Sequence, residues 1–178
     1  ISNATGCSSI WGGSAPATPY TVNTATGHGP AWANSLFEDN AEHGLGIYLG
    51  QKTIRERVIG YVKELREQVN DEKKAVIDTF LATKDNGAEN TAAADALIKM
   101  LESCDCKNEL KDKILAEKDY LAKKSVWIFG GDGWAYDIGF GGLDHVLASG
   151  EDINVMVFDT EVYSNTGGQA SKASNIGQ

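Results

Sequence analysis

The sequence predicts an α/β protein in which a mostly parallel sheet is flanked by helices and carries a helical insertion. Two apolar runs, SVWIF at 125–129 and INVMVF at 153–158, have the composition of strands buried on both faces. A helix-forming segment joins these runs, and a unit of this kind forms a right-handed parallel crossover. Between residues 52 and 124 the apolar residues recur every three or four positions, which is typical of amphipathic helices.

The helical insertion, residues 52–124, should contain four helices. We expect them at 53–69, 71–84, 91–103 and 110–124, with Asn70 and Asp71 forming a break and cap and Thr91 serving as a further N-cap. The segment DNGAEN at 85–90 is predicted to be a loop. We interpret the block as a helical layer packed on a core supplied by the flanks, or alternatively as an arm that binds a partner.

The flanks should supply the sheet. In the crossover we expect a helix over 136–148, with Asp137 as its N-cap and Gly150 just past its end. The N-terminal flank suggests a strand, a loop-rich stretch, and then a helix that starts near Pro30. The whole chain is interpreted as one partial domain, residues 1–178.

The net charge of −9 is confined to the flanks. Residues 52–124 contain 15 of the 16 Lys and Arg and 15 of the 25 Asp and Glu, so this block is formally neutral. The remaining residues contain one Lys, ten acids and 18 of the 20 glycines. Acidic flanks are a poor surface for a nucleic-acid backbone, and no apolar run approaches the length of a membrane span. We therefore expect neither a nucleic-acid nor a membrane partner.

The end of the first predicted strand carries a carboxylate without a basic partner nearby. Asp132 lies in the turn GGDG, and no Lys or Arg occurs between Val126 and Lys172. Because parallel strands end at the same edge of a sheet, Asp132 should lie close to Thr160, which follows the second strand. Carboxylate, hydroxyl and carbonyl oxygens suit Mg²⁺. The alternative is that Asp132 only caps a turn.

Two common phosphate-binding motifs are excluded. The chain has no G-x-x-x-x-G-K-[ST] sequence, and the dinucleotide motif that would begin at Gly131 has Tyr136 where its last glycine should be.

Two longer blocks resemble a known family. The sequence GDGWAYDIGFGGLDHVLASGEDINVMVFDTEVYSNTGGQASKA resembles, nearly residue for residue, the thiamine diphosphate site of pyruvate:ferredoxin (flavodoxin) oxidoreductases. The broader thiamine diphosphate signature, Gly-Asp-Gly followed by about thirty residues ending in Asn, runs here from Gly131 to Asn165. NATGCSSIWGGSAPATPYTVN and GPAWANSLFEDNAEHGLG are similar to an earlier part of the same domain. The resemblance implies a thiamine diphosphate-binding fold.

The resemblance also implies a set of site residues. Asp132, the Thr160 side chain and the Val162 carbonyl would bind Mg²⁺, which holds the diphosphate. Asn165 would lie near the thiazolium and the substrate as a catalytic residue, and Cys7 would be a ligand of a [4Fe-4S] cluster. The other residues expected to contact the cofactor are Thr5, Gly6, Gly133, Trp134 and Ala135. The family's remaining cluster ligands and its activating glutamate are not in this sequence.

The activity implied by the resemblance is oxidative decarboxylation of pyruvate to acetyl-CoA and CO₂. Electrons would pass to iron–sulfur clusters and then to ferredoxin or flavodoxin, in a homodimer located in the cytoplasm or in an anaerobic organelle such as a hydrogenosome. The opening ISNATG has no initiator methionine and no signal-peptide pattern. We therefore expect a segment of a larger polypeptide that also contains the pyrimidine-binding domain. The alternative is a non-catalytic α/β module with a structural Gly-Asp-Gly turn and a helical interaction surface.

The remaining candidates are assigned structural or incidental roles. Cys104 and Cys106, placed two apart on a predicted helix, would point to different sides and are expected to be incidental thiols. His28, His43 and His145 lack ligand partners at useful spacing, and Asp144 and Glu161 are expected to be solvated or capping carboxylates.

Overall fold

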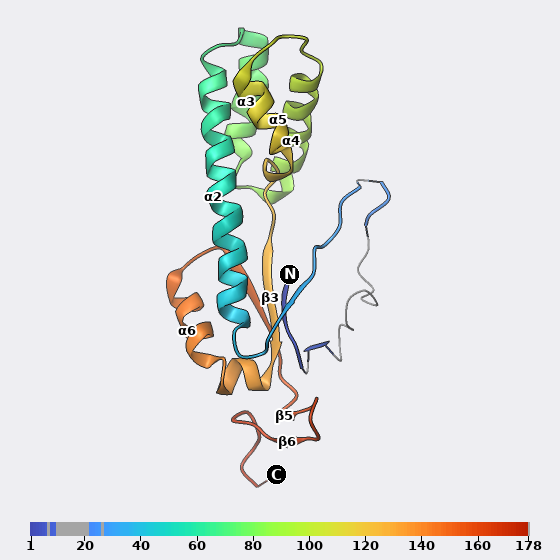
Figure 1. Cartoon of the computed structure of the whole chain (residues 1–178), viewed down its shortest axis with the longest axis vertical. Helices are drawn as coiled ribbons and strands as arrows, with labels where there is room; N and C mark the ends of the chain where they lie inside the picture. The colour runs from blue at the N-terminus through green and yellow to red at the C-terminus, as the bar shows by residue number, and fades with distance from the viewer. Residues whose placement is uncertain (7, 10–21, 26, 178) are drawn as a thin grey trace. The chain divides into compact units, whose positions relative to one another are not determined.

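The computed structural model describes residues 1–6, 8–9, 22–25 and 27–177, and the chain divides into two compact units (Figure 1). Residues 1–48 and 126–178 make up the first unit, and residues 49–125 make up the second. Helix α2 (Asn40–Arg66) begins in the first unit and ends in the second. The interpretation of residues 52–124 as an insertion into one domain remains a prediction.

The first unit is built on a four-stranded parallel sheet with strand order β2-β1-β3-β4. Its strands are β1 (Ser2–Ala4), β2 (Ala33–Ser35), β3 (Val126–Gly131) and β4 (Ile153–Phe158). The two strands predicted from apolar runs, β3 and β4, pair over their full length, with Val126 opposite Ile153 and Gly131 opposite Phe158. The predicted α/β class with a parallel sheet flanked by helices is confirmed.

The start of α2 and helix α6 (Phe140–Ser149) pack on one face of this sheet, as the members of the core show. The buried residues of this core are Ala4, Ala41, Ile128, Trp134, Ala135, Leu143 and Val146. The helix approaches the sheet closely at Gly44, where an added Cβ would lie 2.4 Å from Ile128 Cγ1. The buried Asn40 side chain holds the same junction by accepting from Ser2 Oγ at 2.6 Å and donating to the Phe129 carbonyl at 2.8 Å.

Two predictions for the first unit are wrong in detail. The helix expected near Pro30 begins instead at Asn40, because residues 33–35 extend as β2 and pair with β1. Pairing with a neighbouring strand here outweighs local helix propensity. Asp137 does not cap the crossover helix: it ends a π-helical turn, η2 (Gly133–Asp137), and α6 begins at Phe140. Gly150 does end α6, in a left-handed conformation with φ of 66°.

The second unit is a helical bundle with its own core. It contains the remainder of α2, then α3 (Asp71–Thr83), α4 (Gly87–Glu102), α5 (Glu109–Ala116) and the 3₁₀ turn η1 (Lys118–Tyr120). Its buried residues are Val58, Ile59, Val62, Leu65, Ile77, Phe80, Ala93, Ala94, Leu97, Leu101, Ile114 and Leu121. No described helix has the length and apolar composition needed to cross a bilayer.

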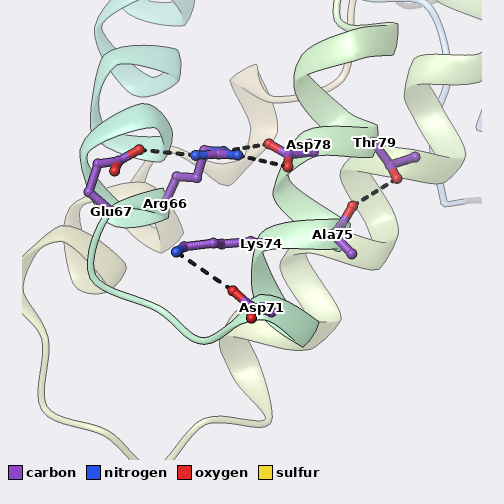
Figure 2. Close-up of polar contacts among 7 residues, drawn as sticks. All are labelled: Arg66, Glu67, Asp71, Lys74, Ala75, Asp78 and Thr79. Atoms are coloured by element: carbon purple, nitrogen blue, oxygen red, sulfur yellow. Dashed lines mark hydrogen bonds and ion pairs between the residues drawn. The ribbon is translucent and has the colours of Figure 1, made fainter.

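Polar contacts join neighbouring helices of this unit at their surface. Figure 2 shows the Arg66 guanidinium, in the last turn of α2, between Glu67 and the Asp78 carboxylate of α3. The hydrogen bonds from Arg66 lower the pKa of Asp78 below its ordinary value. Both side chains are substantially exposed, so this pair contributes little to stability on its own.

Three expectations for the second unit are corrected. Asn86, rather than Thr91, caps α4 by accepting from the Ala88 amide at 3.1 Å, so most of the predicted loop DNGAEN is helical. The last predicted helix ends at Ala116 and is followed by a 3₁₀ turn. Cys104 and Cys106 lie in the loop after α4, not on a helix, and form a disulfide rather than incidental thiols.

Candidate functional site

The carboxyl end of β3 places Asp132 at the edge of the sheet, where its residue is completely buried. Asp132 Oδ2 accepts two hydrogen bonds from Thr160, one from the backbone N at 3.1 Å and one from Oγ1 at 2.9 Å. Thr160 lies two residues beyond the end of β4. The two strand ends therefore bring together side chains that are 28 positions apart in the sequence.

Three oxygen atoms of different chemistry converge at this point: a carboxylate oxygen of Asp132, a hydroxyl oxygen and a carbonyl oxygen. Thr160 Oγ1 lies 2.9 Å from Asp132 Oδ2 and 3.0 Å from the Val162 carbonyl oxygen. A hydroxyl has one hydrogen to donate, so it satisfies only one of these two acceptors at a time. Within the described residues, the other carboxylate oxygen, Asp132 Oδ1, is buried and has no hydrogen-bond partner. A buried carboxylate oxygen without a partner is costly, and a hard cation would satisfy it.

The turn that directs the Val162 carbonyl toward Thr160 passes through an unusual backbone conformation. Glu161 has a φ of 65°, which is uncommon for a residue with a side chain. Its amide donates to Asp159 Oδ1 at 3.0 Å and its carbonyl accepts from Ser174 Oγ. Its carboxylate also accepts from Asn175 Nδ2 at 3.3 Å. These contacts hold the turn in place, and they assign Glu161 a structural role.

A tyrosine links the π-helical turn after β3 to the loop after β4. Tyr136 donates from its hydroxyl to Asp159 Oδ2 at 2.9 Å. The hydrogen bond from the Glu161 amide, followed by the one from Tyr136, lowers the pKa of Asp159 below its ordinary value. The same contact with Asp159 raises the pKa of Tyr136. Asp159 is therefore held as an anion and Tyr136 as a neutral donor.

A second tyrosine attaches the short hairpin of β5 (Val162–Tyr163) and β6 (Gln169–Ala170) to the same turn. Tyr163 donates from its hydroxyl to Asp137 Oδ2, and this contact raises the pKa of Tyr163. Lys172 Nζ lies 3.7 Å from Asp137 Oδ1. The ring of Tyr163 approaches Gly133 so closely that an added Cβ would lie 2.8 Å from Tyr163 Cε1. Glycine at position 133 is thus required by the packing of the hairpin.

A cavity of about 400 Å³ lies beside this cluster, within the first unit. Its lining is mostly apolar and includes residues from β1, the β3–η2 turn and the β5–β6 hairpin. The lining residues are Ala4, Thr5, Gly6, Phe37, Gly131, Gly133, Trp134, Ile138, Tyr163, Asn165 and Thr166. An apolar cleft with a polar cluster at one end is the usual form of a small-molecule site.

Five of the ten residues predicted to bind the cofactor or its metal line this cavity. Thr5, Gly6, Gly133, Trp134 and Asn165 line it, whereas Ala135 is buried in the adjacent core. Cys7, the predicted cluster ligand, lies outside the described residues.

The sequence analysis missed several residues that line the cavity or support the site. These are Phe37, Tyr136, Asp137, Ile138, Tyr163 and Thr166. Of these residues, Tyr163 could have been found from the sequence, because it is an aromatic residue between Val162 and Asn165, which were both predicted to belong to the site.

Among the described residues, Asp132 belongs to no larger cluster of metal-ligating side chains, and the nearby Asp159 is engaged by Tyr136 and by a backbone amide. In the part of the chain that the structure describes, no three His, Cys, Asp or Glu side chains are grouped so that they could hold a metal ion. His43 is engaged elsewhere, with Nδ1 2.7 Å from Ser2 Oγ. A metal beside Asp132 would therefore have one carboxylate, one hydroxyl and one carbonyl from this chain, and its other ligands would come from a bound anion and water. That ligand set fits Mg²⁺.

Comparison with known proteins gives close matches over nearly the whole chain. The chain is 55% identical over 177 residues to a pyruvate-flavodoxin oxidoreductase of Klebsiella pneumoniae. It is 57% identical over 183 residues to a pyruvate:ferredoxin oxidoreductase of Moorella thermoacetica. A mitochondrial NADP⁺ pyruvate dehydrogenase of Euglena gracilis is 51% identical over 178 residues. Each match covers 99% of this chain.

The matched region is a small part of each relative. It amounts to 15% of the Klebsiella protein, 16% of the Moorella protein and 10% of the Euglena protein. No protein-family model matches the chain. The comparisons favour an enzyme over a non-catalytic module. The chain corresponds, over 99% of its length, to a segment of the pyruvate:ferredoxin and pyruvate-flavodoxin oxidoreductases, as its sequence motifs predicted.

Proposed function

We propose that this chain provides the magnesium and diphosphate anchor of a thiamine-dependent pyruvate oxidoreductase, together with one wall of its cofactor pocket. The observation that carries the proposal is the buried, unpartnered Asp132 Oδ1 beside Thr160 Oγ1 and the Val162 carbonyl. These three groups would hold Mg²⁺, and the ion would hold the diphosphate. In this proposal residues 1–178 form part of one cofactor-binding domain, with the helical unit as its insertion.

Each remaining group has a role that follows from its position. Gly133 would let the backbone come close to the diphosphate, and the Trp134 ring, which is 1% exposed, anchors the turn in the core. Asn165, Thr5 and Gly6 line the cavity and would face the thiazolium and the substrate. The apolar lining would exclude water from the reacting carbon. Thiamine diphosphate, when bound, supplies an electron sink for cleavage next to a carbonyl group.

The activity of the whole protein is proposed from its relatives. Proteins named pyruvate-flavodoxin and pyruvate:ferredoxin oxidoreductase match this chain at more than half of the aligned positions. We infer oxidative decarboxylation of pyruvate to acetyl-CoA and CO₂, with electrons passed through [4Fe-4S] clusters to ferredoxin or flavodoxin. Cys7 would provide one cluster ligand, and parts of the polypeptide outside residues 1–178 would provide the others. The same polypeptide would contain the pyrimidine-binding domain. We propose a homodimer that acts in the cytoplasm or in an anaerobic organelle.

The test replaces Asp132 with asparagine in the full-length protein. Asp132→Asn keeps the shape of the side chain and removes its charge. The affinity for Mg²⁺ and thiamine diphosphate should fall by roughly 100-fold or more, because losing a residue that only hydrogen-bonds to a metal ligand already costs up to about 100-fold. Bound cofactor is measured by fluorescence after oxidation to thiochrome, and bound metal by mass spectrometry.

The matched control is Asp144→Asn, which removes an exposed carboxylate from α6 of the same unit. This variant should retain its cofactor. Equal cofactor content in the two variants, with circular dichroism unchanged, would refute the proposed anchor.

A further inference from the structure

The loop between α4 and α5 holds a disulfide whose position does not suit a structural role. It joins Cys104 to Cys106, with a sequence separation of 2. A disulfide stabilises a protein mainly by restricting the unfolded chain, and the effect grows with the length of the closed loop. A bridge across one intervening residue restricts very little. Its surroundings instead suit a chemical role.

The two sulfur atoms lie in different environments. Cys104 is partly buried and its Sγ accepts a hydrogen bond from Lys73 Nζ at 3.3 Å. Lys111 adds a second positive charge at the same residue, because its Nζ donates to the Cys104 carbonyl. Cys106 is exposed. A nearby ammonium stabilises a thiolate, so Cys104 is the better leaving group and Cys106 is the sulfur that a solvent-borne thiol can reach.

A cavity of about 330 Å³ opens beside the disulfide, within the helical unit. Both cysteines line it, and so do three lysines, Lys73, Lys107 and Lys111. Among the residues described, no carboxylate contributes to this lining, and Asp105, between the two cysteines, lies outside it. Three positive charges in a cleft attract negatively charged small molecules.

We propose that Cys104 and Cys106 form a thiol–disulfide exchange site for small anionic thiols. An incoming thiolate attacks Cys106 Sγ, the bond to Cys104 breaks, and Cys104 leaves as a thiolate facing Lys73. A second thiol attacks the mixed disulfide at the sulfur of the first and releases Cys106 as a thiol after protonation. Two electrons pass from two thiols, which leave as their disulfide, to the protein, which becomes a dithiol. This site does not rest on the proposed magnesium anchor.

The test follows reduction of the disulfide in the full-length protein under argon. Two thiols of equal length are compared, 2-mercaptoethanesulfonate, which is anionic, and cysteamine, which is cationic. Each rate is divided by that of the same thiol with bis(2-hydroxyethyl) disulfide, which is uncharged. Alkylation before and after reduction is read by mass spectrometry on the tryptic peptide of residues 100–107, which contains both cysteines. The normalised rate should be about tenfold higher for the sulfonate, and the preference should shrink as salt is added.

The variants test the role of Lys73. Lys73→Met should slow reduction by the sulfonate about tenfold, which corresponds to the lower end of the free energy of a hydrogen bond to a charged group. Lys73→Arg should keep most of the parent's reduction rate. The control is Lys74→Met in the same helix, since Figure 2 shows Lys74 turned toward Asp71. Equal rates for Lys73→Met and Lys74→Met would refute the assigned role.

Single-cysteine variants test the assigned order of attack without relying on the disulfide. In Cys106→Ser the remaining Cys104 should react with iodoacetamide several times faster than Cys106 does in Cys104→Ser, and Lys73→Met should remove that difference. Reversed reactivities would overturn the order of attack. A peptide that stays fully reduced with excess oxidised 2-mercaptoethanesulfonate, or equal normalised rates for the two thiols, would overturn the exchange site itself.

Discussion

Glycine at position 130 is required by the indole that lies over it. An added Cβ would lie 2.2 Å from Trp134 Cε3, and Trp134 itself is almost fully buried. Neither the strand backbone nor the buried ring has room to move away. This contact explains the glycine at position 130 near the end of β3: the chain turns its own tryptophan back against the strand that precedes it.

We therefore predict that Gly130→Ala lowers the free energy of unfolding by about 1–3 kcal/mol, the usual cost of overpacking a core. The comparison is Gly141→Ala in α6, where an added Cβ meets no atom within 4 Å. That variant should be up to about 1 kcal/mol more stable than the parent, because alanine favours a helix over glycine. Urea titration of both variants measures the two values. Equal stabilities would show that the indole can move.

Sequence reasoning at the residue scale was most informative where topology determines the outcome. Asp132 and Thr160 could be paired because parallel strands end at one edge of a sheet. The hydrogen bonds from Tyr136 to Asp159 and from Tyr163 to Asp137 could not, since they depend on the π-helical turn after β3 and on the path of the chain on either side of Glu161. A left-handed Glu161 sets that path, and a glutamate gives no signal for such a conformation.

Tyr163 and Asp137 provide the connection between the hairpin and the turn after β3. The pKa of the Tyr163 hydroxyl is raised, first by its hydrogen bond to Asp137 and also by burial and by the charge of that carboxylate. A folded-state pKa above the unfolded one means that the contact stabilises the protein fully below a pH of about 10. The contribution is lost as the pH rises through the folded-state pKa.

We predict that Asp137→Asn lowers the pKa of Tyr163 toward its ordinary value. The difference in phenolate absorbance between variant and parent should correspond to at most about half a tyrosine more ionised in the variant near pH 10. In a protein that already carries Tyr163→Phe, adding Asp137→Asn should leave the titration curve unchanged. Identical titration curves for the parent and Asp137→Asn would contradict the hydrogen bond.

The helices of the second unit depend on asparagine caps at their N-termini. Asn70, Asn86 and Asn108 each accept from a backbone amide in the first turn of α3, α4 and α5. The sequence indicated the break at Asn70 correctly but favoured Thr91 over Asn86. Both residue types are good caps, and the choice is made by the buried face of the helix. This face includes Asn90 as well as Ala93, Ala94 and Leu97, so the helix must already be formed before Thr91.

We predict that Asn86→Ala lowers the free energy of unfolding by about 0.5–2 kcal/mol, as for other lost N-caps. Thr91→Ala should leave stability unchanged or raise it slightly, since Thr91 is an exposed residue inside the helix. Thermal unfolding followed by circular dichroism compares the two. A larger loss for Thr91→Ala would place the start of α4 where the sequence first suggested it.

At the scale of the whole molecule, the described residues form two hydrophobic cores. They correspond to the two kinds of composition in the sequence, the acidic, glycine-rich flanks and the charge-balanced helical block. The core of the first unit joins residues before position 46 to residues after position 127, whereas the core of the second lies between Ile54 and Ala122. Periodicity could predict the helical core because its contacts are nearly local. Strands β1 and β2 have three residues each, too few for a pattern, and only pairing with β3 and with each other defines them.

The separate cores predict that residues 49–125 fold on their own. The isolated segment should have helical circular dichroism and a cooperative unfolding transition. Ile77, which is completely buried in α3, tests the point quantitatively, because Ile77→Val should cost about 0.5–1.5 kcal/mol by deleting one buried methyl group. The cost should be the same in the isolated segment and in the whole chain, since the core that contains Ile77 lies inside the segment.

The control for this comparison is Thr79→Ala on the same helix. Figure 2 shows the Thr79 hydroxyl directed to the Ala75 carbonyl of its own helix, at 2.9 Å. Thr79 is exposed, so its loss should change stability by less than about 0.5 kcal/mol in either setting. An isolated segment without a cooperative transition would contradict the separate core. A cost for Ile77→Val that appears only in the whole chain would show that the helical unit depends on the sheet for its packing.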